Sequence, residues 1–185
     1  MFRLFKKSKP TVEYTACFTG HRPQRFKFRY NENDTECIKL KKQIEKVVDT
    51  MIDKGVTTFI SGMALGVDMW GAEIVISKKR INKNIKLIAA VPCRGQENKW
   101  SQQYKGRYNK ILSKADDVIY LANAYTANCM KDRNVYMVDN SDFAIAVYDG
   151  SRSGGTYQTV EYAKSNGHKI IVINPDNLDI QKINF

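Results

Sequence analysis

Residues 141–175 read SDFAIAVYDGSRSGGTYQTVEYAKSNGHKIIVINP and contain one complete strand–helix–strand pattern. The apolar run 142–148 predicts a strand, and the glycine- and serine-rich segment 149–155 predicts a turn. A helical pattern covers residues 156–167, and a second apolar run covers residues 169–173. Two strands joined through a helix over this length are parallel, so the turn lies at the carboxyl end of the first strand. The following helix points its free N–H groups at the turn, which predicts an anion site.

The same alternation of strands and helices continues through the rest of the chain. Further strands are predicted at 14–19, 57–60, 85–91 and 117–121. Four helices are predicted between these strands. The first is capped by Asp34 or Thr35, and the second follows the segment 61–68. The third includes residues 100–112, and the fourth lies around 130–140. The pattern predicts an α/β fold with a mostly parallel, doubly wound sheet. We expect residues 1–12 to be a tail or an edge segment, residues 13–185 to form one domain, and the segment after residue 175 to be a short polar tail.

Composition limits the classes of function. The 185 residues suffice for a substantial core. No apolar run approaches the roughly 20 residues of a membrane span, and no signal-type apolar segment follows the basic N-terminus. We therefore expect no membrane association and a cytoplasmic location. Four widely spaced cysteines without a C-x-x-C pair, and two histidines, predict reduced thiols, no metal site and no cofactor.

The formal net charge of +11 favours anionic partners. Part of the charge is local, because Arg22, Arg25, Lys27 and Arg29 follow the first predicted strand. A solvated basic surface explains such charge without any binding function. A nucleotide or nucleic-acid surface is the alternative.

Parallel sheets bind ligands outside the carboxyl ends of their strands, so four loops are candidate binding segments: 19–23, 61–68, 92–100 and 149–156. The candidate ligand-binding residues in these loops are Thr19, Gly20, His21, Arg22, Ser61, Gly62, Met63, Ala64, Gly66, Asp68, Arg94, Trp100, Gly150, Ser151, Gly154, Gly155 and Thr156.

Each loop has a structural and a functional interpretation. Arg22 could bind a phosphate with two hydrogen bonds, and His21 could contact the ligand or carry a proton. The glycines of 61–68 match neither the dinucleotide fingerprint nor the P-loop, and they indicate either a tight chain reversal or backbone contact with an anion. Asp68 could hold a ribose hydroxyl or cap its own helix. Trp100 fits a core position, or its ring could stack on a base.

Arg133 and Glu161 form the candidate catalytic pair. Hydrolysis at a sugar C1 needs an acid that handles water or an oxocarbenium-like centre, and an arginine can bind the phosphate. Two surface charges, with Glu161 paired to Lys164, explain the same residues without catalysis.

Four motifs, CFTGHRPQRF, FISGMALGVDMWGAE, PCRGQENKW and DFAIAVYDGSRSGGT, together resemble the YpsA-like branch of the SLOG superfamily. That superfamily also contains the DNA-processing protein DprA (Smf) and the LOG-type phosphoribohydrolases. The resemblance covers residues 14–174, with the motifs in family order. It implies a Rossmann-like three-layer fold, a nucleotide or nucleotide-derived ligand at the carboxyl edge of the sheet, and a homo-oligomer.

The LOG-type hydrolase motifs are incomplete in this chain. The segment 130–134 aligns Arg133 with the LOG arginine but lacks the neighbouring His and Lys. The segment 153–156 keeps two glycines and the threonine of the LOG motif but lacks its proline and one glycine, and Thr159 stands in the position of the LOG glutamate. Glu161 lies two positions later, about 200° around a helix.

We therefore expect a protein that binds a nucleotide or a nucleotide-derived small molecule, such as an ADP-ribose-like or cyclic nucleotide species. It would act as a sensor or a sequestering module. One alternative is a phosphoribohydrolase or N-glycosidase that acts on nucleoside monophosphates. The other is a protein that binds single-stranded nucleic acid.

Overall fold

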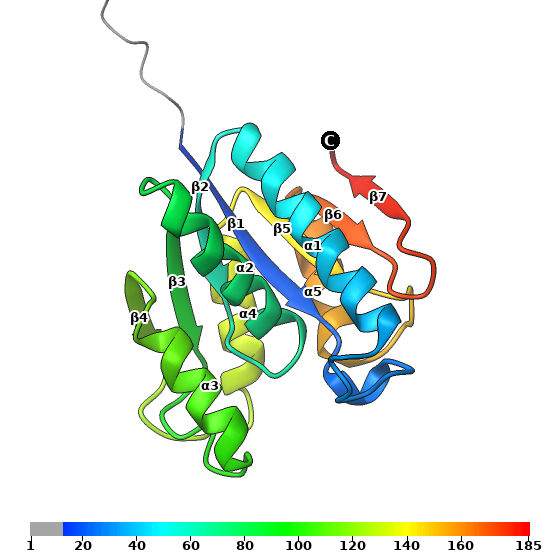
Figure 1. Ribbon diagram of the computed structural model, residues 1–185. Helices are drawn as coiled ribbons and strands as arrows, with labels where there is room; N and C mark the ends of the chain where they lie inside the picture. Colours follow the sequence, from blue (N-terminus) through cyan, green and yellow to red (C-terminus); the bar gives the residue numbers. More distant parts are fainter. Residues whose placement is uncertain (1–12) are drawn as a thin grey trace, which may run out of the picture.

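The computed structural model describes residues 13–185, and the predicted tail 1–12 lies outside the described residues (Figure 1). Seven strands form a sheet in the order β4-β3-β2-β1-β5-β6-β7. They are β1 (Tyr14–Gly20), β2 (Val56–Ser61), β3 (Lys86–Val91), β4 (Asp117–Tyr120), β5 (Phe143–Val147), β6 (Lys169–Ile173) and β7 (Ile180–Ile183). β1 to β6 are parallel, and β7 pairs antiparallel with β6. The predicted doubly wound, mostly parallel sheet is confirmed.

Within residues 13–185, five α-helices cover the two faces of the sheet (Figure 1). They are α1 (Thr35–Asp53), α2 (Val67–Ile81), α3 (Gln102–Leu112), α4 (Cys129–Asp139) and α5 (Gly154–Ser165). α1, α2 and α3 pack side by side on one face, and α4 and α5 pack against each other on the other face. The fold is therefore the expected three-layer, Rossmann-like sandwich.

α2 packs closely against β1, the strand that leads into the first loop. A Cβ atom at Gly71 of α2 would lie 2.7 Å from the ring of Phe18. A Cβ atom at Gly20, the last residue of β1, would lie 2.5 Å from the side chain of Val67. Both glycines thus allow the helix to approach the strand more closely than any side chain would permit.

Three local features differ from the prediction. The segment after residue 175 contains β7, so its assignment as a polar tail was wrong. The strand was missed because a short edge strand with exposed residues needs no buried alternation to pair with its neighbour. Pro23–Arg25 forms a short 3₁₀ turn after β1, which proline tolerates at the first position. α5 begins at Gly154, two residues before the predicted start.

The described chain contains four buried free cysteines. No group of three or more His, Cys, Asp or Glu residues between 13 and 185 is arranged to hold a metal ion. None of the helices in this part of the chain combines the length and the apolar character that a membrane crossing requires.

A charged cluster anchors the loop between β1 and α1 to α2 and α3. Arg107 of α3 donates from Nε to Oε1 of Glu73 at 2.7 Å and from Nη2 to Oε2 of Glu32 at 3.1 Å. Trp70 Nε1 donates to Oε1 of Glu32 at 2.9 Å, and Lys41 also pairs with Glu32. Burial alone would raise the pKa of Glu32, but hydrogen bonds from these three donors lower that pKa to about 2.

Replacement of Glu32 by Gln should lower the free energy of unfolding by about 1–2 kcal/mol near neutral pH, because the partly solvated cluster loses its central acid. The folded-state pKa of about 2 lies below the ordinary value of 4.5, so the charge stabilises the native state above pH 4.5. That contribution is lost as the pH falls toward 2. Urea denaturation of both proteins at about pH 7 and about pH 3 should show a smaller difference at the lower pH. An equal difference at both values would contradict this assignment.

Candidate functional site

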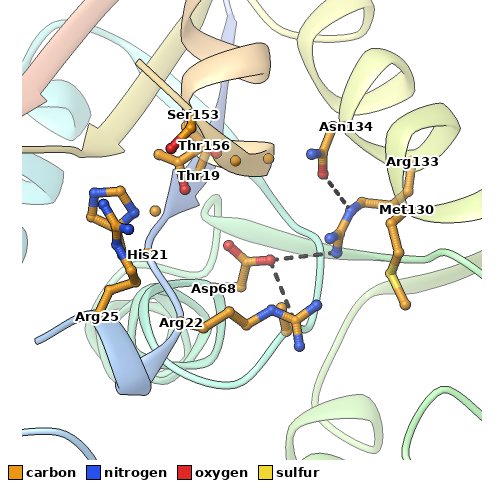
Figure 2. A pocket seen from close by; sticks show the side chains of 14 residues that line it. Thr19, His21, Arg22, Arg25, Asp68, Met130, Arg133, Asn134, Ser153 and Thr156 are labelled. Atoms are coloured by element: carbon orange, nitrogen blue, oxygen red, sulfur yellow. Dashed lines mark hydrogen bonds and ion pairs between the residues drawn. The ribbon is translucent and has the colours of Figure 1, made fainter. Parts of the chain in front are cut away.

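A cleft of about 280 Å³ lies at the carboxyl ends of β1 and β5 (Figure 2). From β1 the chain winds outward to β4, and it then returns to form β5 on the other side of β1. The cleft therefore lies at the topological switch point, where doubly wound sheets bind ligands. Its lining residues are Thr19, Gly20, His21, Arg22, Arg25, Ala64, Asp68, Met130, Arg133, Asn134, Ser153, Gly154, Gly155 and Thr156.

The first turn of α5 forms one wall of the cleft. Ser153 occupies the N-cap position but makes no side-chain capping hydrogen bond, and the first turn contains no acidic residue. The first N–H groups of a helix have no partner inside the helix. Here these groups and the positive end of the helix dipole meet the cleft without a neutralising side chain. This wall favours a phosphate or another anion.

The glycines of this wall differ in whether backbone conformation or packing requires a glycine at their position. Gly150 and Gly154 have φ angles of 84° and 90°, which other residues rarely adopt. Gly155 has no positive φ, and a Cβ atom on it would meet only Nδ2 of Asn134, at 3.9 Å. Neither backbone conformation nor packing requires a glycine at 155, and its missing side chain leaves room in the cleft.

The loop after β1 supplies two exposed arginines to the cleft, Arg22 and Arg25. Nη2 of Arg25 lies 3.3 Å from Oδ2 of Asp149. Within residues 13–185 the side chain of Arg22 forms no ion pair and no hydrogen bond. Arg22 is thus a free cation in the cleft, and it lies on the side of Asp68 (Figure 2).

His21 and Asp149 connect the loop after β1 to the loop after β5. Nε2 of His21 lies 2.9 Å from Oδ1 of Asp149 and 3.4 Å from its backbone nitrogen. The two contacts need different tautomers, because Nε2 donates to the carboxylate but accepts from the amide. Burial alone would raise the pKa of Asp149, but hydrogen bonds from Ser151 and His21 lower it. The ionised carboxylate favours the tautomer that carries its proton on Nε2.

An ion pair between Asp68 of α2 and Arg133 of α4 forms the floor of the cleft. Nη1 of Arg133 lies 3.4 Å from Oδ2 of Asp68 and also donates to the carbonyl of Gly62. Nε of Arg133 donates to Oδ1 of Asn134 at 2.8 Å, and the Ala64 N–H donates to Oδ2 of Asp68 at 3.3 Å. Both charged side chains are buried. Burial raises the pKa of Asp68, and the charge of Arg133 opposes that rise.

The structure brings part of the predicted ligand-binding set to the cleft, together with the predicted catalytic residue Arg133. The predicted binding residues that line it are Thr19, Gly20, His21, Arg22, Ala64, Asp68, Gly154, Gly155 and Thr156.

Four predicted residues lie beside the floor without lining the cleft: Ser61, Gly62, Met63 and Gly66. Oγ of Ser61 donates to the carbonyl of Asp68 at 2.7 Å and accepts the N–H of Met63 at 3.2 Å. A Cβ atom at Gly62 would overlap the guanidinium of Arg133 and lie 2.7 Å from Oδ2 of Asp68. Ser61, Gly62 and Met63 thus support the segment that carries Asp68, whereas Gly66 lies against the loop after β1, where a Cβ atom would be 3.1 Å from the carbonyl of His21.

The third loop does not bring its predicted residues, Arg94 and Trp100, to the cleft. Arg94 is exposed and lies over a tyrosine ring of β4, 4.3 Å from the ring centroid. Trp100 packs edge-on against Tyr108, with ring centroids 5.5 Å apart, and belongs to the core packing. The loop contributes through Gln96 instead, whose Nε2 donates to the carbonyl of Met63 at 3.0 Å.

Glu161 and Gly150 line a second hollow, of about 750 Å³, which also includes residues of β7. Ser151 lines neither hollow, and its N–H donates to Oδ1 of Asp149 at 2.9 Å. The structure therefore does not place Glu161 in the cleft beside Arg133. The reason is helical geometry, because Glu161 lies five residues after Thr156, which corresponds to about 140° of rotation and about 7.5 Å along the helix axis.

Sequence reasoning missed four residues of the cleft: Arg25, Met130, Asn134 and Ser153. Met130 precedes Arg133 by three residues on α4, so helical spacing from Arg133 would have found it. Asn134 adjoins Arg133, and Ser153 directly precedes the predicted glycines. Nothing in the sequence distinguishes Arg25 from the other basic residues of its loop.

A family model described as the YspA SLOG family matches residues 16–178. The SPbeta prophage-derived protein YoqJ of Bacillus subtilis (strain 168) is 34% identical over 154 residues, which cover 75% of this chain and 90% of YoqJ. A UPF0398 protein of Bacillus cereus is 31% identical over 172 residues, which cover 88% of this chain and 91% of the relative. The resemblance indicated by the four motifs is confirmed.

Two solved structures share the fold at low sequence identity. DprA from Streptococcus pneumoniae gives a TM-score of 0.59 at 17% identity, over 90% of this chain and 52% of the DprA chain. TM1055 gives a TM-score of 0.50 at 13% identity, over 85% of this chain and 72% of that protein. This chain thus spans about half the length of the DprA chain, and the two similarities show the fold alone.

Replacement of Gly62 by Ala should push the guanidinium of Arg133 away from Asp68, because the new Cβ atom would occupy its place. We expect the free energy of unfolding to fall by about 1–3 kcal/mol, measured by urea denaturation. Gly106→Ala is the matched control, since a Cβ atom at Gly106 meets no atom within 4 Å. A Gly62→Ala protein as stable as the wild type would refute this description of the floor.

Proposed function

The chain belongs to the YspA SLOG family, and from this membership we propose that it binds a nucleotide or a nucleotide-derived small molecule in the cleft. The ligand is an ADP-ribose-like or cyclic nucleotide species, and the protein acts as a sensor or a sequestering module. One observation carries the proposal: the uncapped first turn of α5 shares the cleft with the free cation of Arg22.

The α5 wall supports a phosphate as the anchoring group of the ligand. Backbone N–H groups at a helix start bind phosphate oxygens, and the absence of a side chain at Gly155 allows those oxygens to approach the backbone. Arg22 has no protein partner within the described residues, so it is available for a charge-assisted hydrogen bond. Arg25 is partly engaged by Asp149, 3.3 Å away.

The size and the polar floor of the cleft support a small ligand. Its volume of about 280 Å³ is close to the lower limit of ordinary ligand pockets, which measure about 300–1,000 Å³. Asp68 and Arg133 place a carboxylate and a guanidinium at the bottom of this space. A phosphate at the wall and polar groups of the same molecule at the floor would use both features.

The phosphoribohydrolase alternative receives less support from the same residues. Its predicted catalytic pair is separated, because Arg133 lies in the cleft and Glu161 in the second hollow. The acid that does lie beside Arg133 is Asp68, which forms an ion pair with it. Thr159 stands where the LOG-type motif has glutamate, and its Oγ1 donates to the carbonyl of Gly155 at 2.8 Å. That hydroxyl is engaged in a hydrogen bond within α5. For these reasons binding is better supported than hydrolysis.

A thermal denaturation series tests the proposal. The panel contains nucleoside mono- and diphosphates, cyclic nucleotides, ADP-ribose and a single-stranded oligonucleotide. A ligand present at 100 times its Kd stabilises the folded state by about 2.7 kcal/mol, which raises the melting temperature measurably. No shift with any nucleotide would refute the proposal. Release of free base would favour the hydrolase, and binding of the oligonucleotide with steep salt dependence would favour the nucleic-acid alternative.

Replacement of Gly155 by Ala should weaken nucleotide binding by about tenfold or more, because the methyl group enters the space beside the α5 amide groups. The melting temperature without ligand should not fall, since the new Cβ atom meets only one atom within 4 Å, at 3.9 Å. Calorimetric titration measures the affinity. Gly106→Ala, which adds the same methyl group to α3 outside the cleft, should bind like the wild type. Equal affinity in the Gly155→Ala protein would show that the phosphate does not lie at this wall.

A further inference from the structure

Two of the four cysteines lie in contact with each other. Sγ of Cys129 is 4.0 Å from Sγ of Cys93, although 36 positions of sequence separate the two residues. Cys17 and Cys37 belong to separate core clusters, and neither contacts another thiol. The sulfurs of a disulfide lie about 2.05 Å apart, so a relative movement of about 2 Å would allow Cys93 and Cys129 to form one.

Both thiols are buried, but each adjoins exposed chain. Cys93 lies two residues after the end of β3 and directly precedes the exposed Arg94. Cys129 is the first residue of α4 and follows the exposed segment 123–128. A local rearrangement of these exposed residues admits a small oxidant to the thiols while the sheet stays closed.

The start of α4 is weakly held, so it can make the required movement. Asn128 occupies the N-cap position of α4 but makes no side-chain capping hydrogen bond. The N–H of Cys129 donates to the carbonyl of Thr126 at 3.3 Å, which is long for a backbone hydrogen bond. Cys93 is anchored more firmly, because it follows a central strand and the next N–H, that of Arg94, donates to the carbonyl of Ala122 at 3.2 Å.

We propose that Cys93 and Cys129 form a redox-active dithiol that hydrogen peroxide converts to a disulfide. One sulfur attacks the O–O bond, takes one oxygen as a sulfenic acid and releases a water molecule. The other sulfur then attacks the sulfenic sulfur, which forms the S–S bond and releases a second water molecule. The two thiols together lose two electrons and two protons, and these reduce the peroxide to water.

The disulfide would couple the redox state of the protein to the cleft. Met130, the residue after Cys129, lines the cleft, and Arg133 lies about one helical turn beyond Cys129 on α4. A bond to Cys93 fixes the first turn of α4 to the end of β3. Oxidation therefore restrains the helix that carries the arginine of the floor. The formation of the disulfide does not depend on which ligand the cleft binds.

Peptide mass spectrometry of the full chain tests this inference. The reduced protein is treated with hydrogen peroxide in its folded state, and the remaining thiols are alkylated after denaturation. We expect two of the four thiols to be lost, a peptide that links Cys93 to Cys129, and recovery of both thiols with dithiothreitol. Retention of all four thiols, oxidation to sulfinic acids, or a link to Cys17 or Cys37 overturns the inference.

Three variants identify the reacting pair. Cys93→Ala and Cys129→Ala should each abolish the linked peptide. Cys37→Ala is the matched control, because Cys37 is also buried but contacts no other thiol, and it should keep the link. A linked pair that persists in either of the first two variants contradicts the assignment. If circular dichroism shows that a variant does not fold, the linked peptide of the unmodified protein decides.

Hydrogen exchange of the unmodified protein tests the coupling to the cleft. The amide groups in the first turns of α4 should exchange about fivefold or more slowly after oxidation, because the tethered helix start opens less often. Exchange in α1, on the opposite face of the sheet, should not change. Equal exchange of α4 in the reduced and oxidised proteins would show that the disulfide does not restrain the helix.

Discussion

The buried ion pair of Asp68 and Arg133 joins the two layers of helices at the edge of the sheet. Asp68 belongs to α2 on one face, and Arg133 belongs to α4 on the other. Desolvation of either charge alone would be costly, so each is stable in this position because the other lies beside it. The loop between β2 and α2 takes its shape from the same pair, since Gly62 accepts from Arg133 and Ala64 donates to Asp68. The floor of the cleft therefore depends on both halves of the chain.

Around this pair the cleft has two ends with opposite chemical preferences. The α5 end offers backbone donors, which attract an anion, whereas Arg22 lies on the side of Asp68 (Figure 2). The floor offers a carboxylate oxygen beside a guanidinium nitrogen, which suits a group that donates and accepts. Asp149 connects the loop after β5 to the loop after β1, because it contacts both His21 and Arg25. The proposal of one small phosphorylated ligand rests on the size, charge and polarity of this cleft together.

Family membership and fold carry different amounts of functional information. The YspA SLOG family model covers residues 16–178, which include the four loops at the carboxyl edge. The similarity to DprA and TM1055 concerns the arrangement of the sheet and its helices. Unrelated activities occur on one fold, so function has to be argued from the residues in the cleft. In this cleft, Arg133 is separated from Glu161, so the catalytic pair predicted from the sequence does not come together.

Local sequence patterns determined the fold class, the six parallel strands and the four loops that meet at one edge, because periodicity and glycine turns are properties of neighbouring residues. The edge strand β7 escaped prediction because its pairing partner, and not its own pattern, makes it a strand. Only the tertiary structure decided which loop residues face the cleft. Ser61 and Asp68 lie in one loop–helix segment, yet only Asp68 of the two lines the cleft. The hydroxyl of Ser61 instead donates to the carbonyl of Asp68. Arg133 reaches Asp68 across 65 positions of sequence. The rotation of each helix about its axis is set by packing against the sheet, and no local pattern contains that information.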